Sequence, residues 1–212
     1  MRRLATPRAA GLAGVLFALL FATALVLIRT SLPEGAQPGS QWVIEGSTNL
    51  RISATIMPFA GLMFLWFIGV VRDGFAGFED KFFSTVFTGS GLLFLAMMFV
   101  ASGVGAGLEA SSAQIAGTEV ATFGQMVLLA ISKTYALRMA AVFMISLATI
   151  WLKTGLMPRW LVTVTYLVAV GLLLASDITM WLTLAFPTWV LVVSLLLLAR
   201  AGVIDLDRHD GD

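Results

Sequence analysis

The chain of 212 residues contains no cysteine and a single histidine, His209. The absence of cysteine excludes disulfides, thiolate metal sites, iron–sulfur clusters and cysteine nucleophiles. Because the only histidine lies next to the C-terminus, a bis-histidine haem, a histidine-held metal and a Ser-His catalytic pair inside the apolar segments are unsupported. We therefore expect no cofactor, no metal site and no enzymatic activity.

Charged residues are also scarce. They make up 12% of the chain, against about 25% in soluble domains, while 59% of the residues are hydrophobic and the mean hydropathy is +0.96. A soluble globule could not bury so much apolar surface. The net charge is only +1 and the cations are scattered at segment ends, so we expect no nucleic-acid partner. The sequence instead indicates a polytopic membrane protein whose first partner is the lipid bilayer.

Six apolar stretches meet or approach the length of about 20 residues that crosses roughly 30 Å of hydrocarbon. They predict one all-α domain over residues 1–212, a bundle of six transmembrane helices with residues 200–212 as a short cytoplasmic tail. The expected helices cover residues 10–28, 52–71, 82–107, 134–152, 160–175 and 178–199. Pro58 is expected near the start of the second helix, where its missing amide hydrogen costs little, and Pro187 is expected to kink the sixth.

Two points stay open at this stage. The first apolar run resembles the core of a secretory signal peptide, but its 19 residues exceed the usual length of about 7 to 15, so we expect it to be retained. The sequence also leaves open whether residues 117–133, which include the amphipathic stretch "FGQMVLLAISK", form an external helix along the outer surface.

The lysines and arginines of the short loops predict the orientation. With the N-terminus in the cytoplasm, nine of the 13 cations fall on the cytoplasmic side. We therefore expect both termini in the cytoplasm and an even number of crossings. The cytoplasmic cations are Arg2, Arg3, Arg8, Arg72, Lys81, Lys153, Arg159, Arg200 and Arg208, and the opposite side keeps Arg29, Arg51, Lys133 and Arg138.

Three stretches carry a family resemblance: "FAGLMFLWFIGVVRD", "EDKFFSTVFTGSGLLFLAMMF" and "YALRMAAVFMISLATIWLKTGLMPRWL". Over roughly residues 50–165 the chain resembles a group of small, uncharacterised multi-span membrane proteins common in actinobacteria. The resemblance implies a protein of the inner (plasma) membrane. It implies no activity and supplies no catalytic residue.

The charges of the outer side provide the candidates for ligand binding or ion pairing. Arg138 lies about 6 Å below the expected start of the fourth helix, so its side chain can reach the lipid headgroups. Alternatively, Arg138 faces the bundle together with Tyr135, which is three residues earlier on the same helical face. The sequence leaves this choice open. The full set of candidates is Arg138, Tyr135, Asp177, Arg51, Glu109 and Glu119.

Small residues at near-helical spacing let helix backbones approach closely, either within the chain or against a partner. The candidates for such a face are Gly89, Gly91, Gly103, Gly105, Ala136 and Ala140. We expect a non-catalytic integral membrane protein that acts by binding, as an accessory subunit of a membrane complex or as the holder of a lipid-like ligand. Its partner would be another membrane protein or further copies of itself. The alternative is a small oligomeric transporter or channel with a polar outer mouth around Arg138 and Asp177.

Overall fold

The computed structural model describes residues 6–31, 47–75, 81–175 and 180–200, and every regular element in these ranges is a helix. In chain order the elements are α1 (Thr6–Ser31), α3 (Ser47–Phe75), α4 (Lys81–Ala110), α5 (Ser112–Ile115), α6 (Glu119–Leu129), the π-helical segment η2 (Ala130–Tyr135), α7 (Ala136–Thr154), α8 (Arg159–Ala175), the 3-10 segment η3 (Met180–Leu184) and α9 (Ala185–Arg200). The prediction of an all-helical chain is confirmed.

Five helical stretches are long and apolar enough to cross a bilayer. They are Arg8–Ser31, Thr48–Gly74, Lys81–Ala110, Glu119–Thr154 and Trp181–Arg200. The remaining apolar helix, α8, has 17 residues and is therefore about 26 Å long at 1.5 Å per residue. The chain is accordingly a multi-pass helical membrane protein.

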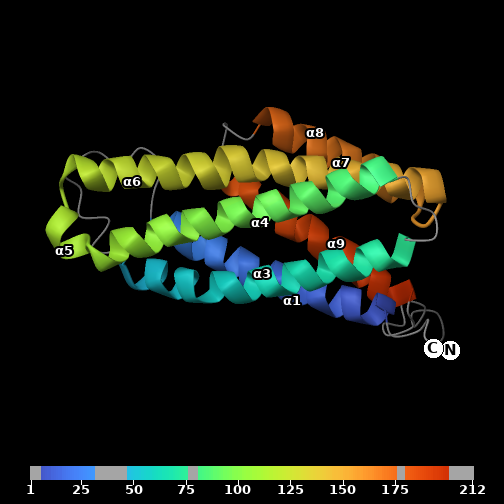
Figure 1. Cartoon of the computed structure of the whole chain (residues 1–212), viewed down its shortest axis with the longest axis horizontal. Coiled ribbons are helices and arrows are strands. Elements are labelled where there is room, and N and C mark those ends of the chain that lie inside the picture. The colour runs from blue at the N-terminus through green and yellow to red at the C-terminus, as the bar shows by residue number, and fades with distance from the viewer. Residues whose placement is uncertain (1–5, 32–46, 76–80, 176–179, 201–212) are drawn as a thin grey trace, which may run out of the picture.

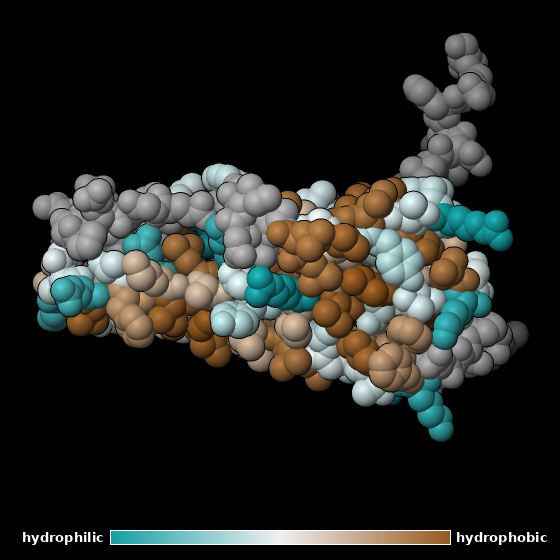
Figure 2. All heavy atoms as spheres, turned by 90° about the horizontal axis from the view of Figure 1, so that it is seen from above, coloured by the Kyte–Doolittle hydropathy of each residue, from teal (hydrophilic) through white to brown (hydrophobic). Residues whose placement is uncertain are grey.

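The surface agrees with this class. Large apolar side chains point outward along several helices, among them Trp66 at 64% exposed, Leu167 at 68% and Leu174 at 79%. Figure 2 shows one face of the molecule on which hydrophobic residues cover much of the surface, hydrophilic residues lie toward the two ends, and one hydrophilic patch interrupts the apolar surface near the middle. Contact with lipid chains satisfies such a surface, whereas contact with water would not.

The long helices pack side by side and alternate in direction, so α1 begins and α9 ends at the same end of the bundle (Figure 1). We call this the terminal end, and we call the opposite end, where α5 lies, the distal end. Neighbouring helices pack in the order α9, α1, α3, α4, α7 and α8. At the distal end, α4 and α6 extend farther than α1, α8 and α9 (Figure 1).

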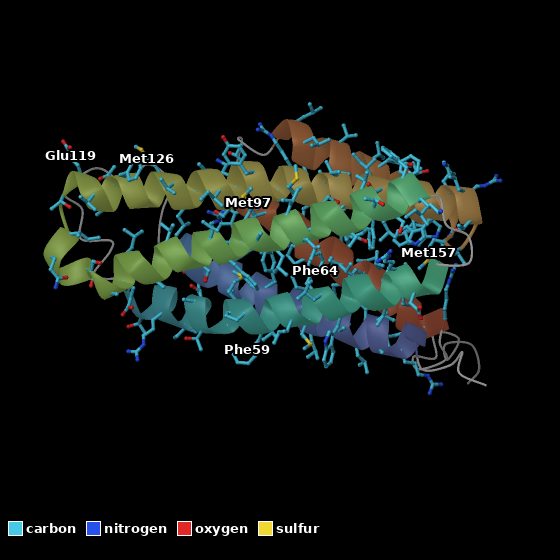
Figure 3. All side chains as sticks on the ribbon, viewed as in Figure 1. Phe59, Phe64, Met97, Glu119, Met126 and Met157 are labelled. Atoms are coloured by element: carbon cyan, nitrogen blue, oxygen red, sulfur yellow. The ribbon has the colours of Figure 1, made fainter. Side chains whose placement is uncertain are left out.

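Phe64 of α3 lies at the centre of an aromatic core. The ring centroids around it are those of Phe17 at 4.6 Å, Phe143 at 5.4 Å, Phe94 at 5.5 Å and Phe186 at 5.8 Å. These four rings come from α1, α7, α4 and α9, and all are buried. In Figure 3, Phe64 points between the helices, whereas Phe59 of the same helix points away from them. Five helices therefore meet through aromatic contacts in the middle of the bundle.

The expectation for Pro58 is wrong. The helix α3 begins at Ser47, so Pro58 is the twelfth residue of a 29-residue helix rather than a residue of its first turn. Proline has no amide hydrogen for the carbonyl of Ala54, and the helix therefore lacks one hydrogen bond in its interior. The apolar run from residue 52 onward predicted the part of the helix that suits hydrocarbon. The polar residues before it, from Ser47, belong to the same helix.

Pro187 lies at a helix start. It is the third residue of α9 and follows the 3-10 segment Met180–Leu184. A proline is tolerated in the first turn of a helix because the amide at that position has no intrahelical acceptor. The sequence predicts a kink at Pro187 within a helix over residues 178–199, whereas the α-helix begins at Ala185 and is preceded by the 3-10 segment.

Residues 119–135 do not form a separate helix along the outer surface. They continue into α7, and the stretch Glu119–Thr154 is a single rod of 36 residues, about 54 Å long. This length exceeds the hydrocarbon thickness of about 30 Å by far. At the distal end the rod packs against α4, where a Cβ added to Gly124 would lie 2.6 Å from Cδ2 of Leu108.

Candidate functional site

Arg29 is the one charged side chain in the described part of the chain that is fully buried, with 3% of its surface exposed. Its Nη2 donates a hydrogen bond of 3.2 Å to the hydroxyl oxygen of Ser132, a residue that is 2% exposed. Ser132 belongs to η2, so this bond joins the last turn of α1 to the π-helical segment. A hydrogen bond that involves a charged group contributes about 1.5–3 kcal/mol.

The periodicity of α1 explains the position of Arg29. Phe17, Phe21 and Leu25 are buried and follow one another at intervals of four, and the next residue on that face is Arg29. The helix therefore carries a cation, instead of another apolar side chain, into the interior at the distal end. A cation in the last turn of a helix is also favoured by the helix dipole. The sequence interpretation missed this site because it treated Arg29 as a boundary charge, and the four-residue repeat was the signal that could have found it.

The π-helical segment separates two parts of the long rod. On its distal side lies α6. On its terminal side lies α7, most of whose residues are buried within the bundle. A π-helical turn inside an α-helix is rare and frequently marks a functional position. The stretch "AISKTY" contains neither proline nor glycine, so no local sequence signal predicts the irregularity.

The position of the Arg29–Ser132 contact along the bundle can be compared with the thickness of a bilayer. Arg29 is 23 residues from the start of α1, and Ser132 is 22 residues from the end of α7, which correspond to about 34 and 33 Å along the helices. The hydrocarbon layer is about 30 Å thick. If the helix ends of the terminal end lie at one boundary, the contact lies just beyond the other.

The other cations of the described residues lie mainly near the two boundaries. We call the boundary near the terminal end the terminal level and the boundary near the Arg29–Ser132 contact the distal level. Lys133 and Lys153 lie 20 residues apart on one continuous rod, a separation of about 30 Å. Lysines and arginines prefer the two headgroup layers, where their side chains reach water and phosphate. The terminal level contains Arg8, Arg72, Lys81, Lys153, Arg159 and Arg200, and the distal level contains Arg51 and Lys133 beside Arg29. Arg138 lies five residues from Lys133 toward the terminal end, about 8 Å deeper.

Arg138 and Tyr135 lie one turn apart on the long rod. Tyr135 is 55% exposed, and Arg138 is half-buried in the first turn of the regular α7 helix. Arg138 lies about 24 Å from the terminal end of α7, since 16 residues separate it from Thr154. Tyrosine is favoured at the membrane interface because its ring is apolar and its hydroxyl is polar.

The acidic candidates lie farther out. Glu119 is the first residue of α6 (Figure 3), and the 19 residues between it and Arg138 span about 28 Å. The structure therefore does not bring these two side chains together. Glu109 is half-buried near the distal end of α4, Arg51 is exposed early in α3, and Asp177 lies outside the described residues.

The predicted small residues divide into an inward and an outward group. A Cβ added to Gly91 would lie 2.7 Å from Cδ1 of Ile68, and one added to Gly105 would lie 3.3 Å from Cδ1 of Leu128. A Cβ added to Gly89 or to Gly103 would meet nothing within 4 Å. The inward group consists of Gly91, Gly105, Ala136 and Ala140, and the outward group of Gly89 and Gly103.

Within the residues that the structure describes, no three histidine, cysteine, aspartate or glutamate side chains form a cluster suited to a metal ion. No family model, no curated protein and no solved structure matches the chain. The functional conclusion therefore depends on the geometry of the bundle itself.

Proposed function

We propose that the chain is a non-catalytic, six-crossing protein of the inner (plasma) membrane that acts as an accessory subunit of a membrane complex. In this proposal α8 is the sixth crossing, because it is apolar, runs antiparallel to α7 and, at 17 residues, is only slightly shorter than the hydrocarbon layer. An even number of crossings leaves both termini on one side. The excess of cations at the terminal level supports the cytoplasm as that side.

The observation that carries the proposal is an exposed apolar face on α6. Val120, Phe123 and Met126 are 61%, 69% and 64% exposed, and their spacing of three residues places them on one side of the helix. Met126 lies seven residues beyond Lys133, so this face begins about 10 Å outside the distal headgroup level. Figure 3 shows Met126 and Glu119 on the distal part of the rod, well away from Phe64. An apolar face that stands in water is typical of a surface that binds another protein.

The aromatic core favours binding over transport. Phe64 and the rings around it fill the middle of the bundle between α1, α3, α4, α7 and α9. A solute pathway would need a continuous polar lining, whereas buried aromatic rings occupy the middle of this bundle. The same packing leaves the centre filled, and a lipid-like ligand would therefore have to bind at the periphery.

Co-purification tests the proposal. The protein is extracted in mild detergent, purified through a tag, and the proteins that accompany it are identified by mass spectrometry. A variant with Val120→Ser, Phe123→Ser and Met126→Ser is expected to lose a stoichiometric membrane partner that the parent chain retains, while its elution profile stays unchanged. The control variant carries Leu12→Ala, Leu16→Ala and Leu19→Ala on the exposed side of α1. Retention of the partner by the α6 variant, or absence of any stoichiometric partner, would contradict the proposal.

A further inference from the structure

The π-helical segment changes which residues of the long rod face inward. The amide of Ala136 donates to the carbonyl of Ile131, a step of five residues where an α-helix has a step of four. Each residue of an α-helix turns the chain by about 100°, so the extra residue turns α6 by about 100° relative to α7. The direction in which α6 presents its side chains therefore depends on this one turn.

The buried residues show the shift. The inward face of α7 advances by steps of three or four residues and consists of Ala136, Ala140, Phe143, Leu147 and Trp151. Continued backward from Trp151 at about 3.6 residues per turn, this face would reach Lys133. The structure instead buries Ser132, which is 2% exposed, while Lys133 is half-buried. From there the inward face continues into α6 through Leu128, Gln125 and Ala121.

Arg29 distinguishes between these two neighbouring residues. Its Nη2 donates a hydrogen bond of 3.2 Å to the hydroxyl oxygen of Ser132. The ammonium group of a lysine has three donors and no acceptor, so Lys133 in the same place could not accept this bond. The hydrogen bond therefore favours the π-helical register, in which Ser132 faces α1, over the register of a regular α-helix.

The register decides which side chains α6 presents outward. The exposed apolar face of α6 consists of Val120, Phe123 and Met126. In a regular helix each residue of α6 would take the direction that the preceding residue has now, and the three outward places would pass to Ala121, Gly124 and Val127. Met126 would then turn into the place of Gln125, which is 4% exposed. The regular register thus replaces a large apolar face by one of smaller side chains.

We propose that Arg29 is a positioning residue, which holds the π-helical register through Ser132 and so turns the apolar face of α6 outward to a partner. The binding role of this face rests on the proposed function, whereas the register does not. The packing of α6 on α4 agrees with the same register, because Gly124 lies against Leu108, where a regular helix would place the longer Gln125. A side chain of α1 therefore controls a surface that begins about 9 Å farther along the rod.

An exchange of two neighbouring residues tests the proposal. The variant Ser132→Lys with Lys133→Ser moves the acceptor by one position at constant composition, so Arg29 should now favour the regular register. The register is read from the rates at which a maleimide labels Ala121→Cys or Met126→Cys in the purified chain. Ala121 is 3% and Met126 is 64% exposed, and position 126 should therefore react at least about 10-fold faster than position 121 in the parent register. In the exchanged variant this order should reverse.

The matched control is the same exchange in an Arg29→Met background. Without a donor at position 29, the exchange should leave the ratio of the two rates unchanged. An unchanged order of reactivity in the exchanged variant, or an equal reversal in the Arg29→Met background, would overturn the inference.

A single substitution replaces the exchange if the exchanged variant does not elute as one species. In Arg29→Met alone, the advantage of position 126 over position 121 should fall below about 3-fold, because the bond that favours the π-helical register is lost. An advantage as large as in the parent chain would overturn the inference. Both assays use the purified chain without a partner protein, so their outcome is independent of the co-purification test.

Discussion

The guanidinium of Arg29 lies 3.2 Å from the hydroxyl of Ser132, and this contact fastens α1 to the π-helical segment between α6 and α7. Its energy can be measured by a double-mutant cycle with Arg29→Ala and Ser132→Ala, followed as the free energy of unfolding in mixed detergent micelles. We expect a coupling energy of about 1.5 kcal/mol, the lower end for a hydrogen bond to a charged group. The cycle of Arg51→Ala with Ser132→Ala is the control and should be additive, since Arg51 is exposed on α3. A coupling near zero for Arg29 and Ser132 would show that the contact does not hold the two helices together.

The close approach of α1 and α9 at Gly14 predicts a strong effect of one methyl group. A Cβ added to Gly14 would lie 1.9 Å from the hydroxyl oxygen of Ser194 and 2.8 Å from the ring of Phe67, whereas one added to Gly103 meets nothing within 4 Å. Gly14→Ala should therefore lower the free energy of unfolding by about 1–3 kcal/mol, the usual cost of overpacking. Gly103→Ala should leave it unchanged or raise it by up to about 1 kcal/mol, because alanine favours a helix over glycine. Equal stabilities of the two variants would rule out close packing at Gly14.

The aromatic core predicts different effects of two phenylalanines on one helix. Phe64 is fully buried, while Phe59 is 59% exposed. Phe64→Ala opens a cavity between five helices and should cost about 3 kcal/mol of unfolding free energy. Phe59→Ala removes a lipid-facing ring and should cost less than about 1 kcal/mol, because surface changes away from packed contacts have small effects. A comparable loss in both variants would mean that the rings do not meet as described.

A buried hydrogen bond between α8 and α9 gives a further test. The indole nitrogen of Trp189 donates to the hydroxyl of Thr165 at 2.9 Å, and Thr165→Val would leave the indole without this acceptor. The unfolding free energy should fall by about 1 kcal/mol. Thr163→Val on the same helix is the control, because Thr163 is exposed and its hydroxyl only bonds back to the carbonyl of Arg159. If the two variants behave alike, the Trp189–Thr165 bond contributes nothing to the docking of α8.

Hydrophobicity located the helices well and their ends poorly. The apolar run over residues 10–28 led to α1, which the structure extends to Thr6–Ser31, and the run from residue 52 led to α3, which begins at Ser47. Hydropathy shows which part of a helix suits hydrocarbon. Backbone hydrogen bonds can extend the helix beyond that part, so hydropathy alone does not locate the helix ends. For the same reason the sequence could not show that residues 119–135 continue α7 instead of lying across the surface.

The candidate site could be predicted only in part. The sequence placed Arg29, Lys133 and Arg138 on one side of the membrane; in the structure Arg29 lies in the last turn of α1 and Lys133 in η2, whereas Arg138 lies five residues farther along the rod toward the terminal end. It did not show that Arg29 is the buried one, because depth along a helix says nothing about the direction a side chain takes. The direction of the Arg29 side chain depends on which face of α1 packs against α3 and α9. It also depends on the π-helical turn that presents Ser132, and the sequence of residues 130–135 does not predict that turn.

The central claim is that hydrocarbon surrounds this bundle and that its distal end faces outward. The reactivity of single introduced cysteines tests this claim most directly. The chain has no cysteine of its own, so each introduced thiol is the only one that can react. Gln114→Cys, Leu167→Cys and Arg159→Cys place a thiol on three exposed positions at the distal end, the middle of α8 and the terminal end. With a membrane-impermeant maleimide we expect position 114 to react on intact cells, position 159 to react only after permeabilisation, and position 167 to remain unlabelled until the protein is unfolded. Ready labelling of position 167 in the native membrane, or labelling of position 159 from outside intact cells, would contradict the account.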